Sequence, residues 1–472
     1  MKLIPIYTWN KSLVSFNKRS GRLSKRPWFQ GALLMVCVAV AMLLANLPFT
    51  KEAYHGFLHT TFTMEMHSPN GVLDFAFPRD MTVEKFINDI LMVIFFFTVG
   101  LEIRREVACG ELSSPRKAML PVIAAFGGVV FPALIYTAVN HGTAAASGWG
   151  IPTATDIAFA VCILSMLGPK VPASLKVFLT ALAIADDLIA ILVVALFYGG
   201  SIKLPLLVVA LAVIAFTLFL RRLGEKSTIP YLLCAVVVWA LFYYSGIHAT
   251  MSGVVMAFLI PAKARYNKAQ YFHKRNHFIR LVDQFDTLDD GEPFPNGPQK
   301  HCLRQLHHIA QGSMDMSYRV EHALSPWVNF LIMPIFALAN AGVEISDPSY
   351  FNIFVRDAEL GSVGMGVFFG LLLGKPVGIT LLSWLAIKLK AGEMPAKASW
   401  GMFFAVACLG GIGFTMSIFV DTLSFSNLAP ESMAHLRDAG KIAVLMGSLC
   451  SGLLGSLLVN LVHHFQSKSV SA

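Results

Sequence analysis

Two adjacent acidic residues, Asp186 and Asp187, lie within a long apolar run of the chain. The nearest preceding charge is Lys176, and ten helical residues correspond to about 15 Å. Because an ionisable side chain at mid-membrane is costly, such a pair indicates a functional site. Two carboxylates cannot both stay ionised in a low-dielectric site unless cations accompany them. Each can be neutralised by a proton, by Na⁺ or by a lysine.

Lys375 is a basic residue in a second apolar run. Glu359 and Lys388, the charges on either side, are too far away for the ammonium to reach an interface. A lysine buried in this way needs an anionic partner or must lose its proton. We expect Asp186 or Asp187 to be that partner.

Asp156 follows a segment rich in Gly, Pro and Thr (residues 148–155), which predicts an interrupted helix whose free backbone groups line a cavity. A second interruption is predicted at residues 410–417. Interrupted spans in the two halves of a chain are typical of a transporter binding site. We expect Asp156, Asp186, Asp187 and Lys375 to be the ionisable residues within the membrane.

The composition explains which solvent surrounds these residues. Charged residues make up 14% of the 472 residues, whereas soluble domains have about 25%. Hydrophobic residues make up 56%, and the mean hydropathy is +0.63. This excludes a disordered or nucleic-acid-binding chain despite the net charge of +9, and argues against a soluble enzyme. The seven cysteines form no CxxC pair, which favours free thiols over disulfides or a zinc site.

The fold class predicted is an all-α polytopic membrane protein with about 12 transmembrane helices. The two interrupted spans are each the middle one of a three-span set, spans three to five and ten to twelve, as inverted repeats would require. The expected spans are roughly residues 29–48, 86–103, 118–139, 150–168, 175–198, 204–220, 229–246, 248–262, 326–343, 362–387, 399–420 and 439–462.

Orientation follows from the 37 Lys and Arg residues, most of which fall on one set of alternating connections. That set is expected to be cytoplasmic, so both termini lie inside the cell. The organisation predicted is a basic N-terminal segment 1–28, spans over 29–263, a polar cytoplasmic insert 264–322, spans over 323–464 and a cytoplasmic tail 465–472.

Two segments are expected outside the membrane. Residues 60–77 alternate around Asn70-Gly71, which predicts an extracytoplasmic β-hairpin that serves as a dimerisation edge or is simply a capped loop. The insert carries six histidines, for which solvated loop positions are favoured over a metal site: His273, His277, His301, His307, His308 and His322.

Seven segments together resemble the NhaA family of sodium/proton antiporters, an inverted-repeat fold. They are Phe97–Glu106, Ala154–Ala160, Ala181–Leu188, Gly246–Thr250, Phe336–Val343, Gly374–Gly378 and Gly411–Ser417. The resemblance implies that Asp187 is the principal ligand of Na⁺ or Li⁺, with Asp186 beside it and paired with Lys375 when the site is empty. It places Thr155 and Asp156 at the crossing of the broken helices, with Thr155 a further ion ligand.

The resemblance also implies a pH response at Glu102, Glu106, Glu321 and His248, and a homodimer formed through the 60–77 hairpin. The residue types and spacing alone do not establish a pH response, because Glu102 and Glu106 can equally be an exposed pair and His248 a structural histidine. The insert and the basic N-terminal segment are longer than the family pattern, so the pH threshold is not carried over.

The function expected is electrogenic Na⁺(Li⁺)/H⁺ antiport by alternating access, without a cofactor. Two titratable carboxylates for one monovalent ion imply more than one proton per cation. An intramembrane aspartyl protease is disfavoured, since such enzymes carry Gly-x-Gly-Asp and here Gly413 is followed by Phe414. An organic-anion carrier, a K⁺ carrier and a cation channel remain as rivals.

Overall fold

The computed structural model describes residues 27–66, 75–200, 202–225, 227–261, 264, 266–285, 297–345, 361–425 and 430–471. The basic segment 1–28 lies almost wholly outside these residues, as do the predicted hairpin turn and part of the insert. The chain forms two compact units. The first comprises Met1–Met92, Glu106–Gly199 and Asn329–Ala472, and the second Val93–Arg105 and Gly200–Val328.

The predicted helical, multi-pass architecture is confirmed. Among the described residues, nine helices are long and apolar enough to cross a membrane, or up to eleven if each of two bent helix pairs counts as one span. The segment predicted as a span at 248–262 is a shorter apolar helix, α11 (Thr250–Leu259). Three predicted spans contain a π-helical turn that sequence does not reveal: Ile87–Leu91, Val328–Ile332 and Gly370–Gly374.

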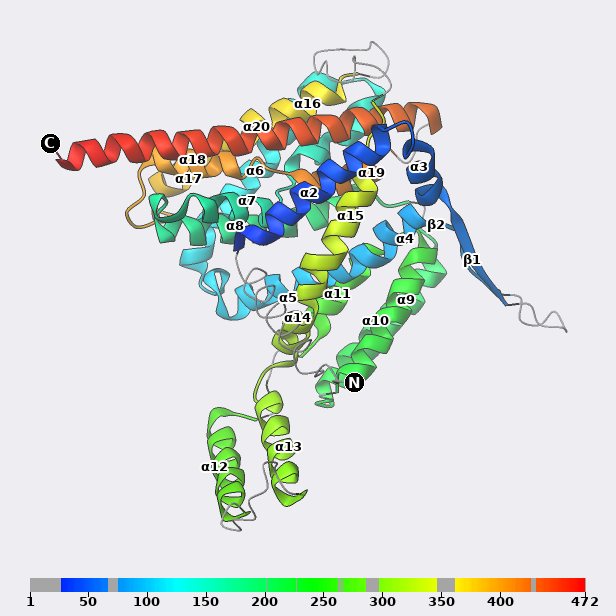
Figure 1. The fold of residues 1–472 in the computed structure, drawn as a ribbon, viewed down its shortest axis with the longest axis vertical. Coiled ribbons are helices and arrows are strands. Elements are labelled where there is room, and N and C mark those ends of the chain that lie inside the picture. Colours follow the sequence, from blue (N-terminus) through cyan, green and yellow to red (C-terminus); the bar gives the residue numbers. More distant parts are fainter. Residues whose placement is uncertain are drawn as a thin grey trace, which may run out of the picture. The chain divides into compact units, whose positions relative to one another are not determined.

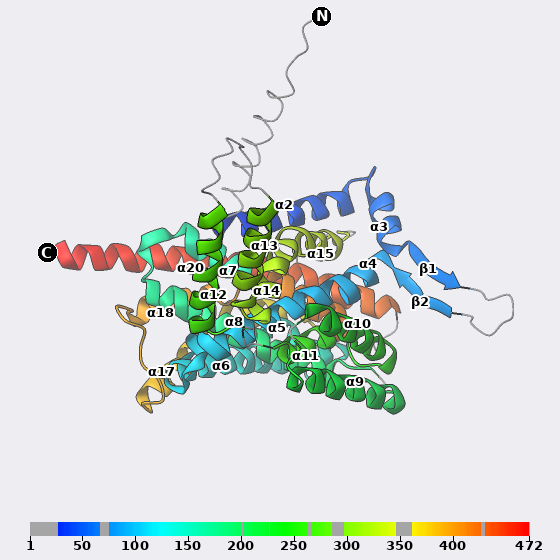
Figure 2. The ribbon, with the colours of Figure 1, turned by 90° about the horizontal axis from the view of Figure 1, so that it is seen from below.

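The first unit consists mainly of helices, with a two-stranded sheet near its start (Figures 1 and 2). Its elements are α2 (Pro27–Asn46), α3 (Lys51–His59), β1 (Thr61–Met66), β2 (Phe75–Thr82), α4 (Val83–Phe86), α6 (Pro115–Asn140), η3 (Ala144–Thr153), α7 (Ile157–Met166), α8 (Ala173–Phe197), α15 (Met333–Asn340), α16 (Val363–Phe369), η7 (Gly370–Gly374), α17 (Lys375–Lys388), α18 (Trp400–Leu409), α19 (Phe414–Ser424) and α20 (Pro430–Ser471). Helix α5 (Met92–Cys109) contributes residues to both units.

The predicted hairpin is present as strands β1 and β2, which pair antiparallel from Thr61 opposite Thr82 to Met66 opposite Phe75. The second strand extends beyond the predicted end, because the next helix begins only at Val83. Thr82 caps that helix, its hydroxyl accepting a hydrogen bond from the Lys85 N–H. Figures 1 and 2 both show the hairpin extending away from the helices of its unit.

Helices α6 and α17 cross at very close range, which fixes the position of Lys375 at the start of α17. Gly127 and Gly378 make the approach possible, since a Cβ on either would overlap the backbone of the other. A Cβ on Gly374 would lie 2.9 Å from Pro132 Cα of α6. The lysine is therefore held by backbone packing and not by its side chain alone.

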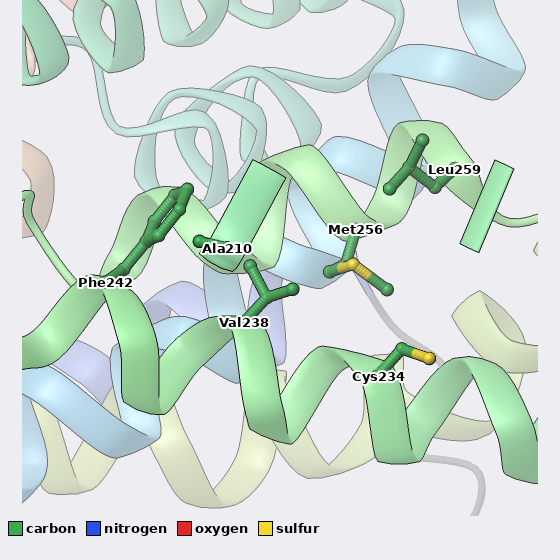
Figure 3. Packing of buried hydrophobic residues seen from close by; sticks show 6 residues of the cluster. All are labelled: Ala210, Cys234, Val238, Phe242, Met256 and Leu259. Atoms are coloured by element: carbon green, nitrogen blue, oxygen red, sulfur yellow. The ribbon is translucent and has the colours of Figure 1, made fainter. Parts of the chain in front are cut away.

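The second unit includes α9 (Leu204–Arg222), α10 (Thr228–Ser245), α11, α12 (Lys268–Phe285), α13 (Gly297–Gly312) and α14 (Met316–Trp327). A core cluster joins its three apolar helices in Figure 3: Ala210 of α9, Cys234, Val238 and Phe242 of α10, and Met256 and Leu259 of α11. The insert forms a helical hairpin of α12 and α13 (Figures 1 and 2). Within the described part of the chain, no group of three or more His, Cys, Asp or Glu side chains is arranged to hold a metal.

Candidate functional site

Two broken helices meet at the centre of the first unit. η3 and α7 are bent by 43° around residues 154–156, and α18 and α19 are bent by 51° around residues 410–413. The breaks are bonded to each other: Asp156 N–H donates to the Ile412 carbonyl at 2.7 Å, and Thr155 Oγ1 donates to the Gly410 carbonyl at 2.9 Å. Backbone groups freed by each interruption are thus satisfied by the other.

Asp156 joins the N-terminal ends of both half-helices that leave the crossing. Its Oδ1 accepts a bond from Phe159 N at 3.1 Å and so caps α7. Its Oδ2 accepts bonds from Thr415 N at 3.1 Å and Thr415 Oγ1 at 2.5 Å at the start of α19. A helix N-terminus carries about half a positive charge, so one carboxylate balances two of them.

A second cap at the crossing was not predicted from the sequence. Ser448 of α20 accepts hydrogen bonds on its Oγ from Gly413 N at 3.2 Å and Phe414 N at 3.1 Å. Serine occurs throughout apolar helices, and residue 448 is far from the break along the chain. No pattern in the sequence distinguishes it from other serines.

Lys375 and Asp186 form a buried ion pair, with the ammonium 2.6 Å from Asp186 Oδ2. The two side chains are 0% and 1% exposed, so solvent does not screen the pair. The ammonium also donates to Thr155 Oγ1, which links it to the helix crossing. The structure therefore brings Thr155, Asp186 and Lys375 into direct contact.

Asp187 is the next residue of α8 and is equally buried, at 2% exposed. Its charge acts on Lys375, although Asp186 is the closer partner. Neighbouring helix positions point about 100° apart, so the two carboxylates present different faces. The ammonium of Lys375 thus contacts Asp186 directly and lies within the field of Asp187. Carboxylate and hydroxyl oxygens are the ligands that hard cations prefer.

Three of the residues implicated in pH response lie in the second unit. Arg105 forms an ion pair with Glu321 and lies 3.8 Å from Glu102, so these two predicted acids share one guanidinium. Glu321 is largely buried, whereas Glu102 is about one-third exposed. Arg104, beside them in sequence, donates to the backbone carbonyls of Ala257 and Ile260.

The other two residues implicated in pH response, Glu106 and His248, form hydrogen bonds with different partners. Glu106 belongs to the first unit, where its Oε2 accepts a bond from Glu111 N at 3.1 Å. His248 lies between α10 and α11, with Nδ1 3.3 Å from Thr250 Oγ1. Burial lowers the pKa of the His248 imidazole to about 4, so the ring is neutral at neutral pH in this conformation.

Two further acids, Asp421 and Asp89, lie within spans and were missed. Asp421 lies inside α19 and is 0% exposed, although the predicted span ended at residue 420. The boundary was placed too early because the sequence after Val420 is polar, while the helix continues to Ser424. The set of four intramembrane charges is therefore incomplete. The π-helical Asp89 also lies within a span.

Comparisons with known proteins agree on one family. The family model described as Na⁺/H⁺ antiporter 1 matches residues 22–459. Proteins named Na(+)/H(+) antiporter NhaA from Oleidesulfovibrio alaskensis and Helicobacter pylori are 42% and 41% identical to the chain. The first match covers 92% of the chain and 91% of the relative, and the second covers 91% and 92%.

A solved structure also resembles the fold. The sodium proton antiporter MjNhaP1 from Methanocaldococcus jannaschii aligns with a TM-score of 0.51 over 94% of this chain and 98% of that chain. The sequence identity is 11%, so this likeness concerns the fold alone.

Proposed function

The chain belongs to the Na⁺/H⁺ antiporter 1 family, and from this premise we propose that Asp186 and Asp187 exchange protons for Na⁺ or Li⁺ by alternating access. The protein is a Na⁺/H⁺ antiporter, which makes it a secondary transporter and not an enzyme. The observation that carries the proposal is the buried pair of acids on α8 that shares the single ammonium of Lys375. Na⁺, Li⁺ and H⁺ are its cargo, and no cofactor takes part.

In the empty site, Lys375 neutralises Asp186 and occupies Thr155 Oγ1. An entering cation binds the oxygens of Asp187, Asp186 and Thr155, so it must displace the ammonium from at least part of this set. On the return half-cycle both carboxyl groups carry protons and Asp186 is not paired with Lys375. The arriving cation displaces these protons, because a carboxylate oxygen cannot hold a proton and the cation at the same time. Exchange of more than one proton for each Na⁺ moves net charge, and transport is therefore electrogenic.

In this proposal, the half-helices at the crossing are the elements that move during alternating access. The half-helices are held by caps and by two bonds between the breaks, and not by continuous helical hydrogen bonding. Asp156 keeps the N-termini neutralised while the half-helices rearrange around the site. In this account the inverted repeats are spans three to five and ten to twelve of a twelve-span bundle in the bacterial inner membrane, with both termini cytoplasmic. Sodium leaves the cell as protons enter.

The pH response is assigned to the Glu102–Arg105–Glu321 group and to His248, with Glu106 at the end of the same helix. Protonation of Glu321 removes its ion pair with Arg105. Protonation of His248 places a charge on a buried imidazole, which disfavours the buried position of the ring. Both changes disfavour the conformation described above. Acid therefore shifts the antiporter away from this state.

The β-hairpin is assigned to a homodimer contact. A two-stranded sheet has exposed edges that readily pair with another strand, and a second copy of β1–β2 supplies one. Cross-linking of single cysteines placed in β1 tests the contact, and a monomeric, uncross-linked protein in native membranes contradicts it.

The experiment that tests the function measures proton flux in proteoliposomes on addition of Na⁺, Li⁺ or K⁺ across a pH series. Proton release with Na⁺ and Li⁺, accompanied by net charge movement, supports the proposal. A Na⁺ current without proton movement indicates a channel, and release with K⁺ but not with Na⁺ indicates a K⁺ carrier.

A further inference from the structure

Asp421 is a buried acid that the exchange site does not use. It lies on α19, six residues beyond Thr415, which corresponds to roughly 9 Å along the helix. Neither carboxylate oxygen accepts a hydrogen bond from any described residue, and the side chain is 0% exposed. A buried carboxylate without such partners is costly, so its retention needs a reason.

Basic and phenolic groups surround this carboxylate without bonding to it. Arg437 and Lys441 of α20 act on its charge favourably, and Asp438 acts against it. Arg437 uses its Nη2 to donate to the Thr422 carbonyl. The positive charges therefore lower the cost of ionising Asp421 but leave its oxygens open to a ligand.

Two tyrosines, Tyr136 and Tyr198, interact electrostatically with Asp421 but direct their hydroxyls elsewhere. Tyr136 donates to the Ala145 carbonyl at 2.7 Å and Tyr198 to the Ser147 carbonyl at 2.8 Å, both in η3. Their phenols still interact electrostatically with Asp421. The acid is thus fully buried, and none of these neighbouring groups donates a hydrogen bond to its oxygens.

A polar row on α19 connects Asp421 with the helix crossing. Ser417 precedes it by four residues, so the two side chains share one face of the helix. Ser417 Oγ is also buried and also has no hydrogen-bond partner among the described residues. Two oxygen-bearing side chains with unused acceptors thus follow one another from the break toward the end of α19.

The close approach of α20 is built around the acid. A Cβ on Gly440 would overlap Asp421 Oδ1, so only glycine leaves room for the carboxylate at this position. Substitution of Gly440 by alanine therefore displaces the Asp421 carboxylate without removing it.

We propose that Asp421, with Ser417, is a second binding station for the transported cation on the outer half of the broken span. Na⁺ leaving the helix crossing binds the carboxylate and releases its proton, and an incoming proton displaces Na⁺ in the return step. The inference rests on the proposed antiport and on the orientation that places the end of α19 toward the outside. It adds a site beyond the Asp186–Asp187 pair.

The test compares Na⁺-driven proton exchange in everted and right-side-out membrane vesicles, which expose the inner and the outer face respectively. In Asp421→Asn, the apparent KM for Na⁺ at the outer face is expected to rise roughly tenfold, the effect of losing one charge-assisted contact. The KM at the inner face stays within about twofold of the wild-type value, since the inner path does not contain Asp421. Asp421→Glu keeps the charge and restores part of the outer affinity.

Two further variants separate a transport role from a structural one. Asp89→Asn removes an acid in another span, away from both proposed sites, and serves as the matched control, with both KM values expected near wild type. Gly440→Ala raises the outer KM in the wild-type background and has no added effect in Asp421→Asn, since the displaced group is then no longer charged.

Equal losses at both faces, or an unchanged outer KM in Asp421→Asn, overturn the inference. Asp187→Asn provides the separate test of the antiport itself, because it abolishes exchange from both faces. Wild-type vesicles that show no exchange at all would reject the antiport, and the second station with it.

Discussion

The Lys375 ammonium lies 2.6 Å from Asp186 Oδ2, in a pair whose side chains are 0% and 1% exposed. Removing one partner of such a pair leaves an uncompensated buried charge. We therefore expect Lys375→Ala to lower the free energy of unfolding by about 3–5 kcal/mol. The combination Lys375→Ala with Asp186→Asn removes both charges and should recover most of this loss.

Thermal unfolding of the four proteins in one detergent measures the coupling between the two residues. A Lys375→Ala protein as stable as the wild type, with no coupling to Asp186→Asn, would show that the ion pair contributes nothing to this conformation.

The second prediction concerns Asp156, which caps α7 and α19 with one carboxylate. Asp156→Asn keeps an acceptor oxygen but loses the negative charge, and should cost about 1–2 kcal/mol of stability. Asp156→Ala loses all three hydrogen bonds and should cost more. Thermal unfolding and Na⁺-driven proton release are measured for both variants. If both variants were as stable as the wild type, neither the charge nor the caps of Asp156 would contribute to stability.

The third prediction concerns Glu321, whose carboxylate pairs with Arg105. Glu321→Gln imitates the protonated acid at every pH, so the exchange rate should depend less steeply on pH while the maximal rate is retained. Glu102→Gln is the control within the same group and should have the smaller effect, because the Glu102 side chain is 37% exposed and an exposed 3.8 Å contact with Arg105 is weak. The rate is measured across a pH series for both variants, and a larger shift in the control would reject the assignment.

The fourth prediction follows from the pKa of His248, which burial lowers to about 4 from its ordinary value of 6.5. Below pH 6.5 the exposed imidazole binds a proton that the buried one does not, so acid favours conformations in which His248 is exposed. The stability conferred by the neutral ring is complete above pH 6.5 and is lost as the pH falls toward about 4. His248→Gln should therefore be less sensitive to acid over this interval. Melting temperature against pH measures this, and an unchanged acid slope would contradict it.

The charges of the exchange site could be found from sequence because each stands out against an apolar background. Asp186, Asp187 and Lys375 are far from any interface in the linear sequence, and membrane physics alone makes them exceptional. The breaks at 154–156 and 410–413 were foreseeable for a related reason, since Gly, Pro and Thr interrupt otherwise apolar runs.

Features that depend on tertiary packing were not accessible in this way. The cap supplied by Ser448 and the fit of Gly440 against Asp421 arise only when α20 lies beside α19. The end of α19 was misplaced because hydropathy falls at Asp421 although the helix continues. The π-helical turn before Lys375 likewise has no sequence pattern of its own.

The central claim is that Asp187 binds the transported cation and that binding of this cation releases protons. The direct measurement is proton release from purified protein in weakly buffered detergent solution on addition of Na⁺, compared between the wild type and Asp187→Asn. Wild-type protein should release more than one proton per bound Na⁺, and Asp187→Asn, well folded by its melting curve, should release none. Undiminished Na⁺-dependent proton release from Asp187→Asn would contradict the account.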